Sequence, residues 1–198
     1  MTSTPPGRAL ALTFLLSVGC HTGGDAKPAV SAGAAAPADW LTPPAVPAAL
    51  AVPPGATLKL HARGVGTQIY VCTAGAAAGA AWVLKAPDAK LYDARGAEIG
   101  THGAGPTWTA SDGSAAVAKK VADAPAAAPD AVPWLLLRVS ANRGAGTFDD
   151  VRYVQRLGTA GGKAPPVGCD AGAVGAAASV PYTADYYFYS GPPAPATP

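Results

Sequence analysis

The sequence predicts an all-β domain, folded as a single β-sandwich or barrel-like domain of about 8–10 short strands. Between residues 45 and 190, short runs of alternating polar and apolar residues recur, separated by turn-forming Gly, Pro and Asp. No window of about 12 residues or more has the 3.6-residue apolar period of an amphipathic helix. The 24 Gly and 21 Pro among 198 residues also argue against long helices.

The first half of the domain contains four expected strands. Residues 57–61 (TLKLH) alternate, with Leu58 and Leu60 on one face and polar residues on the other. Further strands are expected at residues 68–72 (QIYVC), 81–85 (AWVLK) and 90–92 (KLY), and a turn follows at residues 93–96 (DARG).

The second half contains the most apolar strand. Residues 134–139 (WLLLRV) are apolar on both faces, as expected for a central strand. Other strands are expected at residues 114–121, 151–155 and 185–189 (DYYFY). Residues 122–129 (ADAPAAAP) are expected to form a loop, and residues 171–178 could form only a helical turn, because glycines weaken it.

The N-terminus predicts export and a lipid anchor. Arg8 precedes an apolar run at residues 9–18, which is shorter than the ~20 residues that span a bilayer but suits the core of a signal peptide. The run ends in SVGC at residues 17–20, which resembles the lipobox of bacterial lipoproteins. We therefore expect a signal peptide at residues 1–19 and acylation of Cys20. The alternative is an ordinary secretory signal with an incidental cysteine.

The flanking segments complete the domain organisation. Residues 20–44 are dominated by Gly, Ala, Pro and Ser and predict a flexible tether, and residues 191–198 (GPPAPATP) predict a disordered tail. His21 follows Cys20, so the aspartate that retains some lipoproteins at the inner membrane is missing. We expect an exported protein anchored to the cell envelope, at the outer membrane rather than the inner one.

The three cysteines are consistent with this organisation. Lipidation of Cys20 would leave Cys72 and Cys169 as an even pair in an oxidising compartment. Neither of them lies in a CxxC motif, so a disulfide is the plainer interpretation than a metal site.

Charge excludes a nucleic-acid partner. The chain has 14 Lys and Arg against 12 Asp and Glu, a net charge of +2, and the cations are scattered along it. Binding to phosphates requires a basic face. The pair Lys119 and Lys120 is better interpreted as the solvated side of a strand.

A series of segments carries a family resemblance. They are residues 68–72 (QIYVC), 100–108 (GTHGAGPTW), 112–114 (DGS), 132–137 (VPWLLL), 153–156 (YVQR), 161–162 (GG), 168–170 (GCD) and 182–189. In this order they resemble a secreted family of bacteria and fungi known as domain of unknown function 3455. The resemblance implies one exported, β-rich domain with its two matched cysteines paired, and it implies no activity.

Two positions depart from the family pattern. Gly103 follows His102 where the family often has an aromatic residue, and Gly158 stands where Asn is common before Thr159.

The motifs of several enzyme classes fail on their residues. Residues 144–146 (GAG) lack the third glycine and the following helix of a dinucleotide-binding turn. Residues 158–164 (GTAGGKA) have neither the spacing nor the hydroxyl of a phosphate-binding loop. A glycosidase would need paired carboxylates, but Glu98 is the only glutamate and residues 149–150 (DD) point to opposite faces of a strand.

The strongest candidate for a binding site is the set His102, Trp108 and Asp112. These residues surround a glycine-rich stretch at residues 103–106, where the backbone can approach a ligand, and tryptophan offers a flat face to a sugar or an apolar group. The alternative is that Trp108 packs into the core and the glycines only permit tight turns.

A cryptic hydrolase is the competing interpretation of the His102–Ser114 loop. Ser111 and Ser114 flank Asp112, ten residues after His102, and could form a serine, histidine and carboxylate set. Against it, no GxSxG motif occurs, and Asp112-Gly113 suits a two-residue hairpin turn.

The expected function is therefore a lipid-anchored envelope protein that serves as a non-catalytic binding or structural module. An envelope polymer or a small ligand is the expected partner, and no cofactor or metal is expected, because His61 and His102 lack ligand spacing and are expected to be exposed. A hydrolase requires His102, Asp112 and one of the serines to meet beside an open cleft.

Overall fold

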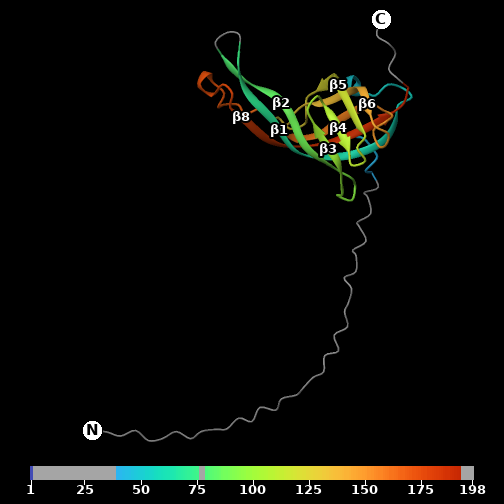
Figure 1. The fold of residues 1–198 in the computed structure, drawn as a ribbon, viewed down its shortest axis with the longest axis horizontal. Helices are drawn as coiled ribbons and strands as arrows, with labels where there is room; N and C mark the ends of the chain where they lie inside the picture. The colour runs from blue at the N-terminus through green and yellow to red at the C-terminus, as the bar shows by residue number, and fades with distance from the viewer. Residues whose placement is uncertain (2–38, 76–78, 193–198) are drawn as a thin grey trace. The chain divides into compact units, whose positions relative to one another are not determined.

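The computed structural model describes residue 1 and residues 39–75 and 79–192, which include an eight-stranded closed barrel (Figure 1). Each strand pairs antiparallel with the next one in the chain, and β1 pairs with β8 to close the barrel. The strands are β1 (Thr57–Ala74), β2 (Ala80–Tyr92), β3 (Glu98–Gly103), β4 (Thr107–Ala110), β5 (Ala115–Ala124), β6 (Trp134–Arg143), β7 (Val151–Gly161) and β8 (Ala177–Ser190). Two 3-10 turns, η1 (Ala48–Leu50) and η2 (Ala171–Ala173), complete the described elements. The all-β prediction is confirmed, in its barrel form.

Strand β1 is longer than the sequence pattern indicates. Residues 57–61 and 68–72, which the pattern separates, belong to one strand of 18 residues. The glycines between them are not turn residues: a Cβ on Gly64 would lie 2.5 Å from Tyr186, and one on Gly66 would lie 2.1 Å from the carbonyl oxygen of Asp88. They allow the neighbouring strands to approach β1 closely.

The bounds of several other strands also differ from those expected from the sequence. Residues 81–85 and 90–92 join into β2, and residues 122–124, expected in a loop, extend β5. Strands β3 and β4 were not anticipated, because they are short and contain few large apolar residues to alternate.

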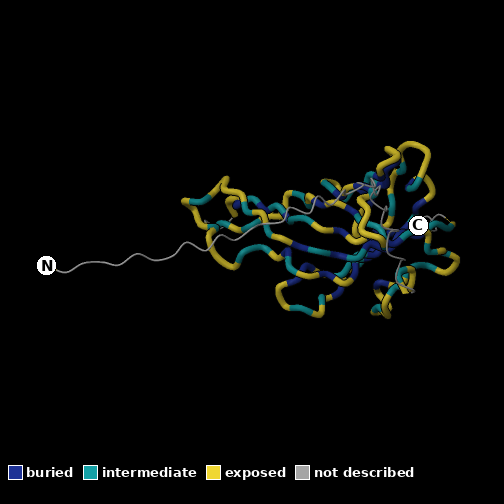
Figure 2. The backbone as a smooth tube through the Cα atoms, turned by 90° about the horizontal axis from the view of Figure 1, so that it is seen from below, coloured by how far each residue is buried: buried dark blue, intermediate teal, exposed yellow. Residues whose placement is uncertain are grey.

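The inside of the barrel combines alanine with large aromatic side chains. Trp108, Phe148, Tyr186 and Phe188 are all buried there, and Figure 2 shows the buried backbone running through the body of the domain. The walls around them include Ala62, Ala89, Ala110, Ala116, Ala118 and Ala184. Small wall residues leave room for rings in a barrel whose eight strands enclose only a narrow interior.

A second apolar cluster lies outside the barrel, beneath residues 39–56. Leu50 of η1 is fully buried in it, and its carbonyl oxygen accepts a hydrogen bond from Gln155 Nε2 (2.7 Å). Trp40 stacks on His61 at 3.9 Å between ring centroids, and His61 stacks on Tyr187 at 4.2 Å. His61, expected to be exposed, is therefore buried because the segment before β1 covers it.

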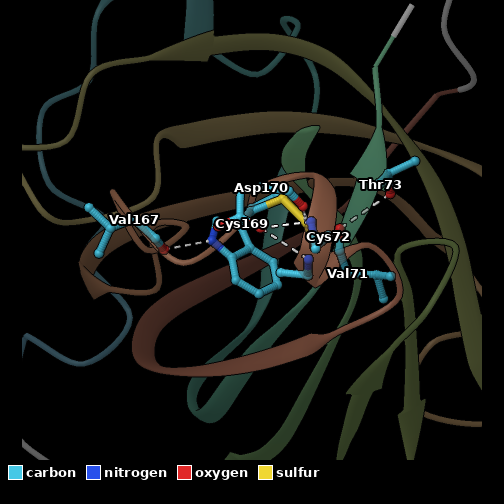
Figure 3. Close-up of a disulfide and its surroundings, with 9 residues drawn as sticks. Val71, Cys72, Thr73, Val167, Cys169 and Asp170 are labelled. Atoms are coloured by element: carbon cyan, nitrogen blue, oxygen red, sulfur yellow. Dashed lines mark hydrogen bonds between the residues drawn. A yellow bond between two sulfur atoms is a disulfide. The ribbon is translucent and has the colours of Figure 1, made fainter. Parts of the chain in front are cut away.

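Strands β1, β2 and β8 continue beyond the barrel as an extended arm (Figure 1). The predicted disulfide is confirmed there, joining Cys72 of β1 to Cys169 with 5.4 Å between the Cα atoms. The loop that carries Cys169 has further contacts (Figure 3), since Trp82 Nε1 donates to the carbonyl of Val167 (3.0 Å) and Asp170 caps η2. The crosslink thus attaches the β7–β8 connection to the arm.

We expect loss of the disulfide to lower the melting temperature by roughly 10 °C or more. The crosslink spans 97 positions, for which loop-closure entropy gives at most about 4–5 kcal/mol of stabilisation. Thermal unfolding of the purified protein with and without reductant measures the effect. A variant with both Cys72→Ala and Cys169→Ala is the control, since reductant should not shift its transition. Equal melting of the oxidised and reduced protein would contradict a stabilising role.

Candidate functional site

A cavity of about 340 Å³ opens at one end of the barrel. It lies where β2, the β3–β4 turn and the beginning of β6 meet. Its apolar wall is formed by Leu84, Pro87, Pro106, Trp108, Pro133, Leu135 and Leu137. Its polar wall is formed by Gln68, Lys85, His102, Lys120, Arg156 and Tyr186. Barrel mouths are frequent positions for small-molecule sites, and this volume falls within the range of such pockets.

The β3–β4 hairpin brings His102 and Trp108 together at this cavity. The two residues lie directly opposite each other in the strand register, and their rings stack at 4.5 Å with an interplanar angle of 8°. Gly105 has a φ of +76°, which the tight turn between the strands requires and which glycine adopts without strain.

His102 is a neutral, buried side chain. It is only 4% exposed, contrary to the expected exposed loop position, because the hairpin folds it against the barrel interior. Its Nδ1 donates to the carbonyl of Thr107 (3.0 Å), which assigns the proton to that nitrogen. Burial lowers the pKa of His102 to about 3, and the Arg156 charge acts in the same direction.

Trp108 does not offer an open face to a ligand. It is 1% exposed; His102 covers one face, and its ring meets those of Tyr186 and Phe188 edge-on. The flat faces of the Trp108 ring are therefore packed in the core, although the residue also lines the cavity. Its indole Nε1 nevertheless has no hydrogen-bond partner among the described residues, although it is buried.

Gln68 and Arg156 are cavity residues that sequence reasoning missed. Gln68 is 1% exposed, and its Nε2 also has no partner of normal hydrogen-bond geometry in the described chain. Arg156 donates from Nε (3.2 Å) and Nη2 (2.8 Å) to the carbonyl of Pro133. Both residues lie in the family-like segments QIYVC and YVQR, but only the barrel register shows that they face inward.

Two tyrosines connect these groups. The hydroxyls of Tyr182 and Tyr186 are 3.2 Å apart, and Arg156 lies opposite Tyr186 in the register of β7 and β8. Burial raises the pKa of Tyr182, while Tyr186, Arg156 and the nearby Gln68 amide act in the opposite direction. Gln68, Arg156 and both tyrosines therefore belong to one polar centre.

Asp112 lies apart from this cavity, at the opposite end of β4 from the β3–β4 turn. Its Oδ1 accepts from the backbone N–H (2.9 Å) and hydroxyl (2.6 Å) of Ser114, and its Oδ2 accepts from those of Thr147 (2.8 and 2.7 Å). These hydrogen bonds, led by that of the Ser114 hydroxyl, hold the pKa of Asp112 well below its usual range. Asp112 thus connects the β4–β5 turn to the loop after β6.

This arrangement does not assemble a hydrolytic triad. The Ser114 hydroxyl donates to Asp112 and accepts from the backbone N–H of Phe148 (3.0 Å). Within the described chain, no hydrogen bond joins His102 to Ser111, Asp112 or Ser114. A serine nucleophile needs a base within hydrogen-bond reach, and His102 is not placed there.

The family assignment rests on a model that matches residues 53–190 and is described as protein of unknown function (DUF3455). The chain belongs to the DUF3455 family. The match contains all eight strands, the disulfide and every cavity residue, and it confirms the resemblance seen in the sequence. No curated protein and no solved structure matches this DUF3455 chain significantly.

Other hollows also lie on the described part of the DUF3455 domain. One of about 420 Å³ is lined by Lys119, Arg138 and Arg152, and one of about 690 Å³ lies beside residues 161–166. The barrel cavity is the stronger candidate, because two fully buried donors that line it have no hydrogen-bond partner of normal geometry in the described segments. In the described part of the chain, no group of three or more His, Cys, Asp or Glu side chains is placed to hold a metal ion. None of its helices is long and apolar enough to cross a membrane.

We expect His102 to weaken the fold as the pH falls. Its native pKa of about 3 is below the unfolded value of 6.5, so the unfolded chain binds a proton that the native state excludes. At pH 4.5 this difference lowers the free energy of unfolding by roughly 2–3 kcal/mol relative to pH 7.5. His102→Asn has no titratable group at this position. Denaturant unfolding at the two pH values should therefore show a pH dependence of its free energy of unfolding that is smaller by that amount. An unchanged dependence would show that the native pKa is not lowered.

Proposed function

We propose that this protein is a non-catalytic, lipid-anchored binding protein of the cell envelope that holds a small molecule in the mouth of its barrel. One observation carries the binding proposal: the cavity is lined by Gln68 and Trp108, whose buried N–H groups have no hydrogen-bond partner of normal geometry among the described residues. An unsatisfied buried donor costs about 1–3 kcal/mol. A ligand that supplies an acceptor would recover that cost.

The polar groups near the cavity support binding rather than catalysis. The Nδ1 proton of His102 is already donated to Thr107, and the low pKa of this side chain makes it a weak base. The hydroxyl and carboxylate that could complete a triad, those of Ser114 and Asp112, bind each other and the loop after β6.

The anchoring part of the proposal rests on the N-terminal sequence. Residues 2–19 of the expected signal peptide and Cys20 lie outside the described residues. The supporting observation is the SVGC sequence after a ten-residue apolar run, followed by a Gly-, Ala- and Pro-rich stretch before the barrel. Such a tether would hold the barrel mouth away from the membrane surface.

Filling the cavity should abolish ligand uptake. We expect the neutral dye Nile red to bind the purified protein saturably, with an increase in fluorescence as it enters an apolar site. Leu135→Trp places a larger side chain in the wall and should weaken binding by about tenfold or more. The matched control is Val121→Trp, at a strand position that is 57% exposed and outside the cavity. Absence of saturable binding, or equal binding by Leu135→Trp and the native protein, would contradict the proposal.

Replacement of the lipidation residue tests the anchor separately. Cys20→Ser should release the protein from the membrane fraction and remove the lipid from its intact mass, because the acyl chains have no other attachment site in this proposal. Continued membrane association of a variant without lipid mass would show that the cysteine is not the anchor.

A further inference from the structure

The cavity wall has an uncompensated positive charge. Its lining includes Arg156, Lys85 and Lys120 but no Asp or Glu. Lys120 forms an ion pair with Asp123 on the surface, whereas Arg156 has no ion pair with any described carboxylate; its guanidinium donates to the Pro133 carbonyl and also interacts with the Tyr186 hydroxyl. Charged side chains inside proteins are usually paired. The guanidinium of Arg156 at the cavity wall is therefore available to an anionic ligand.

The buried hydrogen-bonding groups around this charge are mainly donors. Among the described residues, Trp108 Nε1 has no hydrogen-bond partner, and Gln68 Nε2 has none of normal geometry, although the Gln68 amide lies near the Tyr182 hydroxyl. Arg156 directs two of its five N–H groups to the Pro133 carbonyl, and the Tyr186 hydroxyl is a further neutral partner, so the partners of this guanidinium among the described residues carry no negative charge. Several N–H donors of this kind can hydrogen-bond to one acceptor group whose oxygens have several lone pairs.

These donors converge on the same part of the barrel interior. The Tyr186 ring contacts Trp108 at 5.6 Å between centroids, and Tyr186 lies opposite Arg156 across the β7–β8 pair. The Tyr186 hydroxyl lies 3.2 Å from that of Tyr182. Burial raises the pKa of Tyr182, whereas Arg156 and the Gln68 amide lower it, so both groups lie near this hydroxyl. Strands β1, β4 and β7 thus bring Gln68, Trp108 and Arg156 to one polar centre.

We propose that the cavity ligand is an amphipathic carboxylic acid, whose carboxylate is bound by Arg156, Gln68 and Trp108. This inference rests on the proposed binding function and adds the ligand class. A carboxylate has about four lone-pair sites and pairs with a guanidinium in a planar, bidentate geometry. The apolar remainder of the molecule fits the leucine and proline wall that leads to the mouth. A phosphate monoester is less suitable, because burying its second charge costs more.

His102 is consistent with this chemistry. Its neutral ring adds no second cation beside Arg156, and Nε2 has a free lone pair because the proton lies on Nδ1. His102 therefore shapes the cavity without contributing charge, and the guanidinium is the group that selects an anion.

Octanoate, octanol and octyl phosphate test the head group directly. Each is titrated into the purified full-length protein below its micelle concentration, with displacement of Nile red as the readout. We expect octanoate to bind about tenfold tighter than octanol and tighter than octyl phosphate. Arg156→Gln should weaken octanoate binding about tenfold and leave octanol and Nile red binding unchanged. Arg156→Lys, which keeps the charge, should restore part of the octanoate affinity. Arg63→Gln, at an exposed position of β1 that does not line the cavity, is the matched control and should bind octanoate nearly as the native protein does.

The outcomes separate this inference from the proposed function. Equal affinities for octanoate and octanol, or equal weakening of both by Arg156→Gln, would overturn the carboxylate proposal while leaving the binding function intact. Tighter binding of octyl phosphate would also overturn it. Failure of Nile red and all three ligands to bind would overturn both proposals together.

Discussion

The antiparallel pairing of β1 with β8 is the constraint on which the rest of the structure depends. This pairing closes the barrel, and β1 also pairs with β2 along much of its length. Gly64 and Gly66 make the double pairing possible, because a Cβ at either position would overlap a neighbouring strand or ring. The same strand then places Gln68 at the cavity and Cys72 at the disulfide. Site and crosslink are therefore both consequences of barrel closure.

Most of the fold could be predicted from the sequence, but not which side chains of each strand point into the barrel. Alternation and turn residues predicted β-structure, and the cysteine count predicted the disulfide that the structure confirms. The candidate set was divided: His102 and Trp108 line one cavity, whereas Asp112 stabilises a turn at the far end of β4. Gln68 and Arg156 could not be found from local pattern, because inward orientation depends on a closure that joins the two ends of the domain.

A family departure also has a physical explanation that only the structure provides. Gly158, where the family commonly has Asn, has a φ of +54°, in the left-handed region that Gly and Asn tolerate best. A Cβ there would lie 2.5 Å from Asp185 Oδ2, a flexible side-chain atom that can shift. The backbone conformation at residue 158 therefore explains why Gly or Asn occurs there. Gly158 does not line the cavity, so glycine in place of asparagine does not change the cavity wall.

The binding site lowers the stability of the barrel that contains it, and the rest of the domain offsets this loss. In the part of the chain that the structure describes, two buried donors lack a hydrogen-bond partner of normal geometry and one guanidinium lacks a carboxylate, and each of these is unfavourable inside a protein. The domain has stabilising elements away from the mouth: the disulfide on the arm, the cluster around Leu50 outside the barrel and the Asp112 hydrogen bonds at the far turn. None of them contributes a side chain to the cavity. Because these other elements stabilise the domain, the cavity residues can keep hydrogen-bond donors for a ligand instead of using them on one another.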